Sequence, residues 1–355
     1  MVKLIRFGAI GCGGAGTNRI NQLAKHELGV KVVAAVDVNP ERLDNLSKVI
    51  GYNDFARYTG EQDFKRMIDE NQLDAVGIFT PHSLHLPHVQ YAIKKNLSIL
   101  IEKPMVCGTA NALDVTAQVE AKKLIGIVHY QRHYELKWMK ARELIQKGAI
   151  GKVTNFYVFM AQDWCGRTWR GVPKFCCGGQ INDSGSHYQD ILLWMLNELP
   201  VSAQGFTDSF YRGEKKQGEY NGMFNVELTN GITGRFVILS DIPGGFADDV
   251  RICGTKGNLY FNGDKLIMQD AATKEYTEIP LSRPKGYPIS PCDNFVKLIR
   301  NKVRINRVPF IFGCRVSLLT EAMLRSGRGK GKKILCEDIL KESGHTLDDL
   351  RRDVE

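Results

Sequence analysis

The stretch "KLIRFGAIGCGGAGTNRINQLAKHEL", residues 3–28, decides the fold. Its first eight residues are mainly apolar and predict a strand, and the residues from Thr17 onward predict a helix. Between them the glycines of "GCGGAG" follow the GxGxxG spacing. This spacing predicts dinucleotide binding where a strand turns into a helix whose N-terminal amides receive a pyrophosphate. The candidate cofactor-binding residues of this turn are Gly11, Gly13, Gly14, Ala15 and Gly16.

An acidic residue at the end of the next apolar run indicates which dinucleotide binds. Asp37 follows Gly16 by 21 positions, and a carboxylate there accepts hydrogen bonds from the adenosine ribose hydroxyls. The same carboxylate repels a 2′-phosphate, so the sequence favours NAD over NADP. Arg42, five residues later, could soften this preference.

The pattern of the first turn repeats along the first third of the chain. Short β-branched runs alternate with helical stretches, as in a parallel sheet with helices on both faces. We therefore expect an N-terminal doubly wound Rossmann domain over residues 1–130. Its remaining strands are expected at 31–38, 74–80, 98–104 and 125–130, and its remaining helices at 39–50, 84–95 and 109–123.

A different rhythm begins near residue 131 and predicts a C-terminal α+β domain over residues 131–355. A helix at 135–150 precedes a long alternating strand at 152–163, and a meander with hairpin turn signals follows over 201–270. Two helices are expected from about Pro291 and Phe310. The large, mainly antiparallel open sheet needs a cover on its free face, so we expect a homodimer or homotetramer formed through it.

Composition limits the class of protein. The 355 residues are 43% hydrophobic and 25% charged, as in globular chains of two domains. No apolar run reaches the roughly 18 residues that span a bilayer, so no membrane contact is expected. The net charge of +9 is dispersed, and its one dense segment, "RSGRGKGKK" at 325–333, is interpreted as a solvated loop rather than a nucleic-acid site. The expected location is cytoplasmic.

Cysteine usage supports the same location and argues against a metal site. The nine cysteines are scattered and odd in number, which suits a reducing compartment. A zinc alternative exists because some cysteines lie near a histidine in sequence. The chain has no CxxC pair, however, and adjacent cysteines rarely bind one tetrahedral ion together, so no metal is expected. The residues weighed were Cys165, Cys176, Cys177 and His187.

A lysine stands where the cofactor crevice should open. "SILIEKP", residues 98–104, is a strand that ends at Glu102-Lys103-Pro104. Ligands of open parallel sheets bind beyond the carboxyl ends of the strands, so Lys103 should point into the crevice. Its ammonium could bind a substrate hydroxyl and stabilise the alkoxide that develops as hydride leaves the carbon. The alternative is an ordinary surface lysine at a strand end.

An ordered set of motifs decides between these interpretations. "GCGGAG", Asp37, "TPHSLH", "EKP", "YQRHYE" and "GGQINDSGSHYQD" follow one another over nearly the whole chain. Together they resemble the glucose-fructose oxidoreductase and inositol dehydrogenase family, Gfo/Idh/MocA. The resemblance implies an NAD(P)-dependent oxidoreductase that acts on CH–OH groups of a sugar or cyclitol. It places Lys103 between nicotinamide and substrate. The cofactor contacts that it implies are Thr80, His82, His85, Glu102 and Arg132, with His82 standing where the family usually has Asn.

The motif "NDSGSHYQD" supplies a candidate acid and base. The motif opens a predicted helical stretch, and Asp183 and His187 are four residues apart, which places both side chains on one helix face. An imidazole can accept a hydroxyl proton near neutral pH, and Asp183 could orient it. The resemblance assigns the same roles, so Lys103, Asp183 and His187 are the candidate catalytic residues. The alternative is a capping carboxylate and a structural histidine.

Aromatic and basic residues before this motif predict a sugar pocket. Aromatic faces pack on the C–H faces of sugars, and arginine donates to hydroxyls or carboxylates. For the tryptophans, core or interface packing is the alternative. The candidate substrate-binding residues are Lys103, His133, Trp164, Trp169, Arg170, Asp183 and His187.

The sequence therefore predicts an NAD-dependent dehydrogenase that oxidises a secondary hydroxyl of a sugar, cyclitol or glycoside. Two other functions stay open. One is a redox-neutral enzyme that oxidises a sugar transiently and keeps its cofactor. The other is a non-catalytic NAD-binding regulator. The sequence does not specify the substrate or the carbon that is oxidised.

Overall fold

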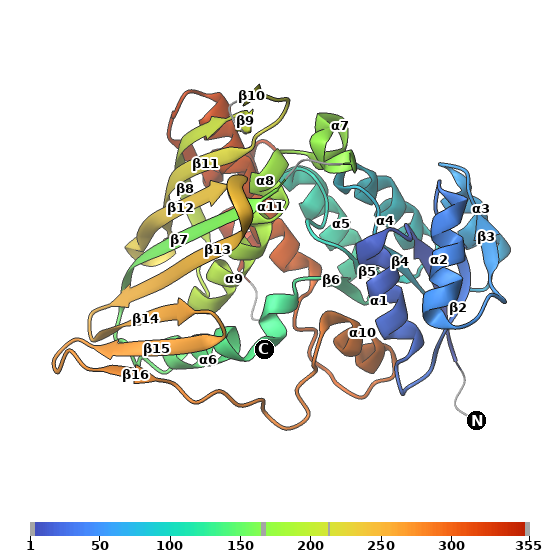
Figure 1. Ribbon diagram of the computed structural model, residues 1–355, viewed down its shortest axis with the longest axis horizontal. Coiled ribbons are helices and arrows are strands. Elements are labelled where there is room, and N and C mark those ends of the chain that lie inside the picture. The colour runs from blue at the N-terminus through green and yellow to red at the C-terminus, as the bar shows by residue number, and fades with distance from the viewer. Residues whose placement is uncertain (1–3, 165–167, 212–213, 352–355) are drawn as a thin grey trace.

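A computed structural model describes residues 4–164, 168–211 and 214–351 of the chain. Its first half is a six-stranded parallel sheet in the order β3-β2-β1-β4-β5-β6, the doubly wound arrangement that the sequence predicts. Figure 1 shows this layer, in blue and cyan, beside the second sheet. The strands are β1 (Ile5–Ile10), β2 (Val30–Val36), β3 (Ala56–Tyr58), β4 (Ala75–Ile78), β5 (Ser98–Ile101) and β6 (Gly126–Val128).

Helices cover both faces of this sheet. They are α1 (Gly14–Ala24), α2 (Pro40–Ile50), α3 (Asp63–Glu70), α4 (His85–Lys94) and α5 (Thr109–Ala121). The sequence prediction left out β3 and α3. β3 is only three residues long and lies at the sheet edge, so its alternation is too brief to detect. α3 is short, and it buries one face through Phe64, Met67 and Ile68.

The second half is built on a nine-stranded sheet in the order β16-β15-β14-β13-β7-β12-β11-β8-β17. Its neighbours are antiparallel except β7 and β12, which run parallel because helices and a further hairpin separate them along the chain. The strands are β7 (Val153–Asp163), β8 (Pro200–Asp208), β11 (Asn221–Leu228), β12 (Thr233–Leu239), β13 (Asp241–Gly254), β14 (Gly257–Asn262), β15 (Lys265–Asp270), β16 (Tyr276–Glu278) and β17 (Ile334–Leu335), and β9 (Phe210–Tyr211) pairs with β10 (Glu214–Lys215).

Alternation along the strands gives this sheet a buried and an open face. Phe224 and Val226 on β11 are buried against the helices behind the sheet. Met223, on the opposite face of the same strand, is 59% exposed. Phe206 on β8, which is 64% exposed, lies opposite Met223 in the strand register. Two large apolar side chains therefore lie together on the open face.

Helices from both ends of the second half occupy the space between the sheets. α9 (Gly185–Leu196) and α11 (Phe310–Arg328) pack together behind the nine-stranded sheet, and α11 also packs on α5 and β6. α10 (Pro291–Ile299) packs on α1. The remaining helices are α6 (Leu136–Gln146), α7 (Pro173–Cys176), α8 (Gly179–Asn182) and α12 (Cys336–Lys341), with 3-10 turns η1 (His82–Leu84), η2 (Gln131–Tyr134), η3 (Thr168–Gly171), η4 (Thr229–Gly231) and η5 (Leu347–Leu350).

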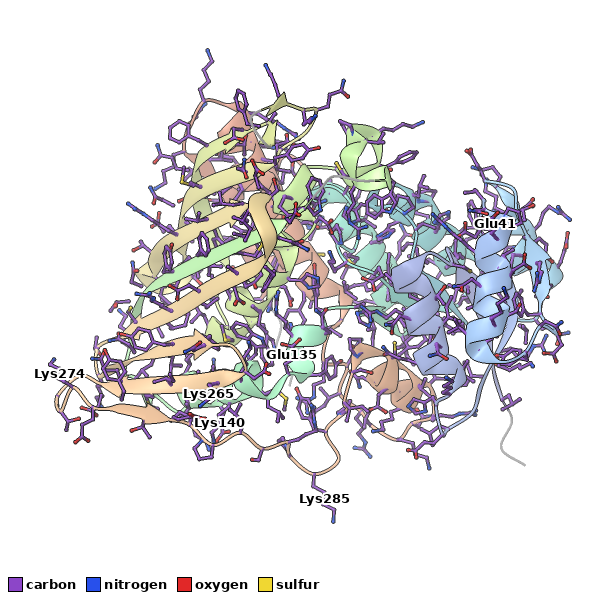
Figure 2. The ribbon with its side chains drawn as sticks, in the orientation of Figure 1. Glu41, Glu135, Lys140, Lys265, Lys274 and Lys285 are labelled. Atoms are coloured by element: carbon purple, nitrogen blue, oxygen red, sulfur yellow. A yellow bond between two sulfur atoms is a disulfide. The ribbon has the colours of Figure 1, made fainter. Side chains whose placement is uncertain are left out.

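Charged side chains are dispersed over the rim of the molecule. Figure 2 shows Lys265, Lys274 and Lys285 on the β15–β16 hairpin and the loop after it, and Glu41 on α2 at the opposite end of the molecule. Within the described residues, no helix is both long and apolar enough to cross a membrane.

Candidate active site

The glycine turn leaves its backbone open to a ligand at some positions and closes it at others. Gly11 has φ +88°, and a Cβ there would lie 2.8 Å from the carbonyl oxygen of Phe79. A Cβ on Gly16 would collide with the carbonyl oxygen of Gly11. A Cβ on Gly14, in contrast, would meet nothing within 4 Å. Gly11 and Gly16 thus let α1 start close to the sheet, and the free space lies over the first amides of α1, where a pyrophosphate fits.

Asp37 follows β2 and lies beside this turn. Its carboxylate accepts hydrogen bonds from the backbone N–H of Cys12 at 2.7 Å and of Asn39 at 3.0 Å. These bonds fix its orientation and leave acceptor positions for ribose hydroxyls. Arg42 lies 3.5 Å from Asp37 Oδ1, and its side chain is 47% exposed. The turn and Asp37 together fit an NAD molecule.

Lys103 reaches across the crevice to the other half of the molecule. It follows β5, and the peptide bond that joins it to Pro104 is cis. Its Nζ donates to Asp183 Oδ1 at 2.7 Å and to the Asp183 carbonyl oxygen at 3.0 Å. The side chains are only 11% and 3% exposed, so this is not an exposed surface lysine. Two of its three N–H groups are used, and the third is left for a substrate oxygen.

Asp183 is the residue on which this half of the site converges. Its Oδ2 accepts from Trp164 Nε1 at 2.8 Å and from Arg170 Nε at 2.7 Å. Burial raises the pKa of the carboxyl, but the charges of Lys103 and Arg170 outweigh it and hold the pKa well below its usual value. Asp183 is therefore ionised and anchors cations, rather than serving as a proton acceptor.

The predicted single helix through Asp183 and His187 is wrong. α8 ends at Asn182 and α9 begins at Gly185, and Asp183 lies in the kink between them with φ −75° and ψ −88°. Within the described residues no hydrogen bond joins Asp183 to His187, because the Asp183 oxygens are taken by Lys103, Trp164 and Arg170. Asp183 consequently positions Lys103 and does not orient the imidazole.

His187 lies in the first turn of α9 and has one buried and one accessible ring nitrogen. Nδ1 is buried without a hydrogen-bond partner. Nε2 is not among the buried unpartnered atoms, and no described residue bonds to it, so it has surface of its own. Burial lowers the pKa of His187 well below 6.5, and the charges of Lys103 and Arg132 lower it further. A neutral ring with an accessible Nε2 can accept a proton.

The crevice floor between β5 and β6 contains an ionic cluster. Glu102 Oε1 accepts from Arg19 Nε of α1 at 2.9 Å and lies 3.8 Å from His129 Nδ1. Burial raises the pKa of Glu102, but the charges of His129, Arg19 and Lys103 outweigh it and lower the pKa overall. Burial lowers the pKa of His129 to about 4. Sequence reasoning named Glu102 but missed Arg19 and His129, although His129 follows a parallel strand as Lys103 does.

Thr80 of "TPHSLH" borders the glycine turn, since its Cγ2 would lie 3.0 Å from a Cβ on Gly11, and the polar atoms of the motif bind protein groups. Thr80 Oγ1 lies 3.1 Å from His88 Nδ1. His85 is fully buried, with Nδ1 2.8 Å from the Pro104 carbonyl oxygen and Nε2 2.9 Å from that of Thr80. Both nitrogens of His85 thus lie against backbone carbonyl oxygens, one at the β4 end and one at the "EKP" turn, which argues against direct cofactor contact. His82 faces the second half of the molecule.

The structure places Arg132 and His133, neighbours in η2, in different surroundings. The Arg132 guanidinium carbon lies 4.0 Å from the Tyr188 ring centroid, and its Nη1 is buried without a partner. His133 is fully buried, its Nε2 2.8 Å from Asp190 Oδ2 and its ring 4.3 Å from that of Trp194. The prediction that His133 contacts the substrate is corrected here, because its ring is buried in the core under α9. Arg132 Nη1 is a buried donor without a partner among the described residues, and the Arg132 charge acts on His187.

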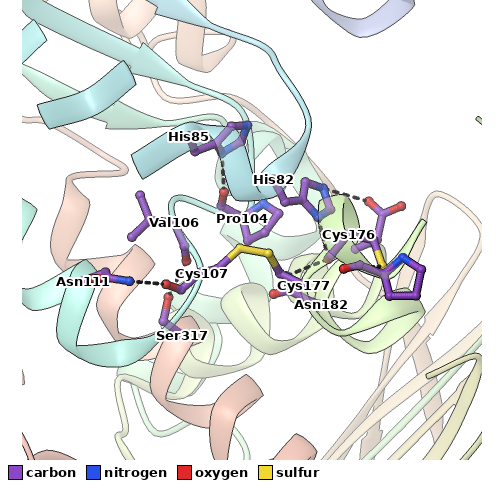
Figure 3. The surroundings of a disulfide bond; sticks show 12 residues. His82, His85, Pro104, Val106, Cys107, Asn111, Cys176, Cys177, Asn182 and Ser317 are labelled. Atoms are coloured by element: carbon purple, nitrogen blue, oxygen red, sulfur yellow. Dashed lines mark hydrogen bonds and ion pairs between the residues drawn. A yellow bond between two sulfur atoms is a disulfide. The ribbon is translucent and has the colours of Figure 1, made fainter. Parts of the chain in front are cut away.

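A disulfide joins the two halves beside these residues. Cys107, four residues after Lys103, is bonded to Cys177, six residues before Asp183, and their Cα atoms are 6.2 Å apart. Figure 3 shows the bond with His82, Pro104 and Cys176 around it. The sequence led us to expect unpaired cysteines. This pair could not be predicted, because the two cysteines are 70 residues apart in the sequence. Cys165 of the zinc alternative lies outside the described residues, in which no group of metal-binding side chains was found.

Two family models match this chain. The model described as an oxidoreductase family with an NAD-binding Rossmann fold matches residues 5–130, and that of the GFO/IDH/MocA C-terminal domain matches residues 138–260. The chain belongs to the Gfo/Idh/MocA family of oxidoreductases. Its N-terminal half is thus an NAD-binding Rossmann domain, as the glycine turn and Asp37 indicate.

Relatives share the family at low identity. "Oxidoreductase P35" of Formosa agariphila is 25% identical over 274 residues, which cover 74% of this chain and 80% of that protein. An inositol 2-dehydrogenase of Streptomyces avermitilis is 27% identical over 202 residues, and the match spans 56% of this chain and only 55% of that enzyme's length.

Solved structures show the same fold over nearly the whole chain. The aldose-aldose oxidoreductase of Caulobacter crescentus, complexed with glycerol, has a TM-score of 0.79 at 20% identity and covers 94% of this chain and 100% of its own. The inositol dehydrogenase homolog of Azotobacter vinelandii, complexed with NAD+, has a TM-score of 0.80 at 17% identity, covering 94% and 98%.

Proposed function

We propose that the protein is an NAD-dependent dehydrogenase that oxidises a secondary hydroxyl of a sugar, cyclitol or glycoside. The observation that carries this proposal is that the ammonium of Lys103 lies close enough to the His187 ring for its charge to act on it. Lys103 comes from the Rossmann half and is fixed by Asp183, and His187 from the other half presents an accessible Nε2. The relatives' names, inositol 2-dehydrogenase and levoglucosan dehydrogenase among them, support a polyhydroxylated ring as substrate.

The side chains divide the chemistry as follows. His187 Nε2 accepts the hydroxyl proton, and the remaining N–H of Lys103 donates to the oxygen on which negative charge grows. NAD, when bound, supplies the hydride acceptor. The products are a ketone, a reduced cofactor and a proton that leaves from His187 to solvent.

The surroundings of the reacting oxygen suit this division. Asp183 holds the Lys103 ammonium in place without becoming a competing base, because its carboxylate is saturated by three donors. Trp169 and Arg170, from the segment over the crevice, are half-buried and could contact the sugar. Arg170 is now held by Asp183, so a substrate hydroxyl or carboxylate would share it.

A panel of hexoses, inositols and glycosides, each incubated with NAD and followed at 340 nm, tests the proposal. We expect steady NADH formation with at least one ring substrate and a loss of about 10²–10⁴-fold in kcat for His187→Asn. Product formation without net NADH would instead establish the redox-neutral enzyme. NAD binding without turnover of any substrate would support the regulator.

We further propose that the protein forms a homo-oligomer through the open sheet face. Exposed Phe206 and Met223 lie side by side there, and an apolar pair of this kind is typical of a subunit contact. Size-exclusion chromatography with light scattering should give a multiple of 39.9 kDa, and Met223→Lys should lower it. A monomeric wild-type protein would refute this part.

A further inference from the structure

His82 is buried between the two halves of the molecule. It lies in η1, after β4 of the Rossmann sheet, and is only 3% exposed. Its Nδ1 is 3.1 Å from the carbonyl oxygen of Cys176. Its ring meets that of Trp169 edge to face, with centroids 4.7 Å apart, and its Nε2 is 3.7 Å from Asp183 Oδ1. One side chain therefore touches three points of the segment 169–183.

The partners of His82 determine where its proton lies. A carbonyl oxygen only accepts hydrogen bonds, so Nδ1 carries the proton and donates to Cys176. Burial lowers the pKa of His82 to about 3, and the ring is consequently neutral near pH 7. A neutral ring places no charge beside Asp183, so it does not compete with Lys103 for the carboxylate. The groups that face it are Asp183, Lys103 and His85.

We propose that His82 is a positioning residue for the reaction. Its Nδ1–H and its ring edge hold the segment 169–183 against the Rossmann half, so that Asp183 meets Lys103 at the geometry observed. The inference deepens the proposed function, because the position of the Lys103 ammonium is what that function requires. It also replaces the predicted cofactor contact of His82, since its polar atoms face Cys176 and Asp183 instead.

The arrangement around Cys176 shows why a side chain is needed there. The Cys176 carbonyl oxygen also accepts from Asn182 Nδ2, at 3.3 Å, which belongs to the same segment. The disulfide holds Cys177 to the Rossmann half, whereas the ring of Trp169 meets the His82 ring. His82 thus links Trp169 and the Cys176 carbonyl to the Rossmann half, next to the Lys103 contact with Asp183.

Three variants separate the two parts of this contact. His82→Asn keeps an amide donor at the place of Nδ1, His82→Phe keeps the ring edge without the donor, and His82→Ala removes both. We expect kcat to fall about 10²-fold in His82→Ala, about 10-fold in His82→Phe and less than about 5-fold in His82→Asn, with the KM for NAD unchanged. A kcat for His82→Ala within 3-fold of wild type, or an equal loss of kcat and NAD affinity in all three variants, would overturn the proposal.

A second measurement does not depend on turnover. Arg170 and Lys174 are trypsin sites on the segment, and trypsin should cleave there about 10-fold faster in His82→Ala than in wild type or His82→Asn, as mass spectrometry of the fragments would show. Equal cleavage rates in the folded proteins would refute the positioning role. Absence of NADH formation by the wild type would refute the proposed function, whereas the cleavage rates would still decide the role of His82.

Discussion

The two sides of the crevice are built by different means. The cofactor side is formed by one continuous stretch, β1 to α1, with Asp37 after the next strand. The substrate side is formed around Asp183 by residues that follow β5 and β7 and by residues of η1 and η3, which lie far apart in sequence. The first side depends on local backbone space and the second on long-range side-chain contacts. The two should consequently respond differently to substitution.

Among the variants that compare the two sides, Lys103→Met should have the largest effect, and it affects the substrate side alone. Removal of the donor that stabilises the oxyanion should lower kcat about 10²–10³-fold, with NAD affinity retained. Steady-state assays at 340 nm and NAD titration by calorimetry measure both. Lys103→Arg keeps a positive charge beside Asp183. It should therefore be more stable than Lys103→Met but have an equally low kcat. Lys265→Met, on the rim, is the control and should behave like wild type. Equal activity of Lys103→Met and wild type would contradict the proposed role.

The disulfide couples the two sides, and its loss should lower the free energy of unfolding rather than act directly on kcat. Cys177→Ser removes a bond between residues 70 positions apart. We expect the free energy of unfolding to fall by about 2–4 kcal/mol in urea titrations under non-reducing conditions. Cys253→Ser, at a free and half-buried cysteine, is the control. Titration of thiols in denaturant should find two more in the reduced protein than in the oxidised one, and an equal number would contradict the pairing.

A pair of glycine variants tests whether the cofactor side depends on backbone space. Gly16→Ala places a Cβ against the Gly11 carbonyl, whereas Gly14→Ala meets nothing within 4 Å. Gly16→Ala should cost about 1–3 kcal/mol of stability and weaken NAD binding, and Gly14→Ala should leave the fold intact. Thermal unfolding with and without NAD distinguishes the two. Equal melting temperatures for both variants would show that the contact relaxes freely.

The last effect concerns pH and the buried histidines that border the crevice. The pKa is lowered to about 3 for His82 and to about 4 for His129, below the value near 6.5 of the unfolded chain. Below pH 6.5 the unfolded state binds more protons, so stability should fall as the pH falls. The slope is at most about 1.4 kcal/mol per pH unit for each histidine and continues toward pH 3–4.

Urea unfolding at several pH values between 7.5 and 4.5 measures this slope. Glu102 and Asp183 also lose stabilising interactions as the pH falls, but their contribution begins only near the carboxyl pKa of the unfolded chain, about 4. His129→Gln should flatten the slope between pH 6.5 and 4.5, and His345→Gln, at a partly exposed ring, should not. A slope unchanged by His129→Gln would contradict the burial argument.

The same contrast explains what could be predicted from sequence. The glycine turn, Asp37 and the end of β5 follow from local patterns, and the structure confirms the doubly wound sheet that they indicate. The four-residue spacing of Asp183 and His187 led to the wrong prediction of a single helix, because the chain kinks at Asp183 and no local sequence signal marks the kink. Partners such as Arg19 for Glu102, or His82 for Cys176, depend on packing between segments 83 and 94 residues apart. Such contacts are not encoded in any short stretch.

The last hundred residues return to the Rossmann sheet. Asp293 in α10 lies 3.0 Å from His26 Nε2, and Arg300 donates to the carbonyl of Gly29. Farther on, the Val308 carbonyl accepts from Val128 N at 3.0 Å, which extends the edge at β6. A fragment truncated after residue 130 would lose this cover and leave the β6 edge and the outer side of α1 bare. The point at which the sequence changes its rhythm is therefore not a point at which the polypeptide can be divided into two self-sufficient pieces.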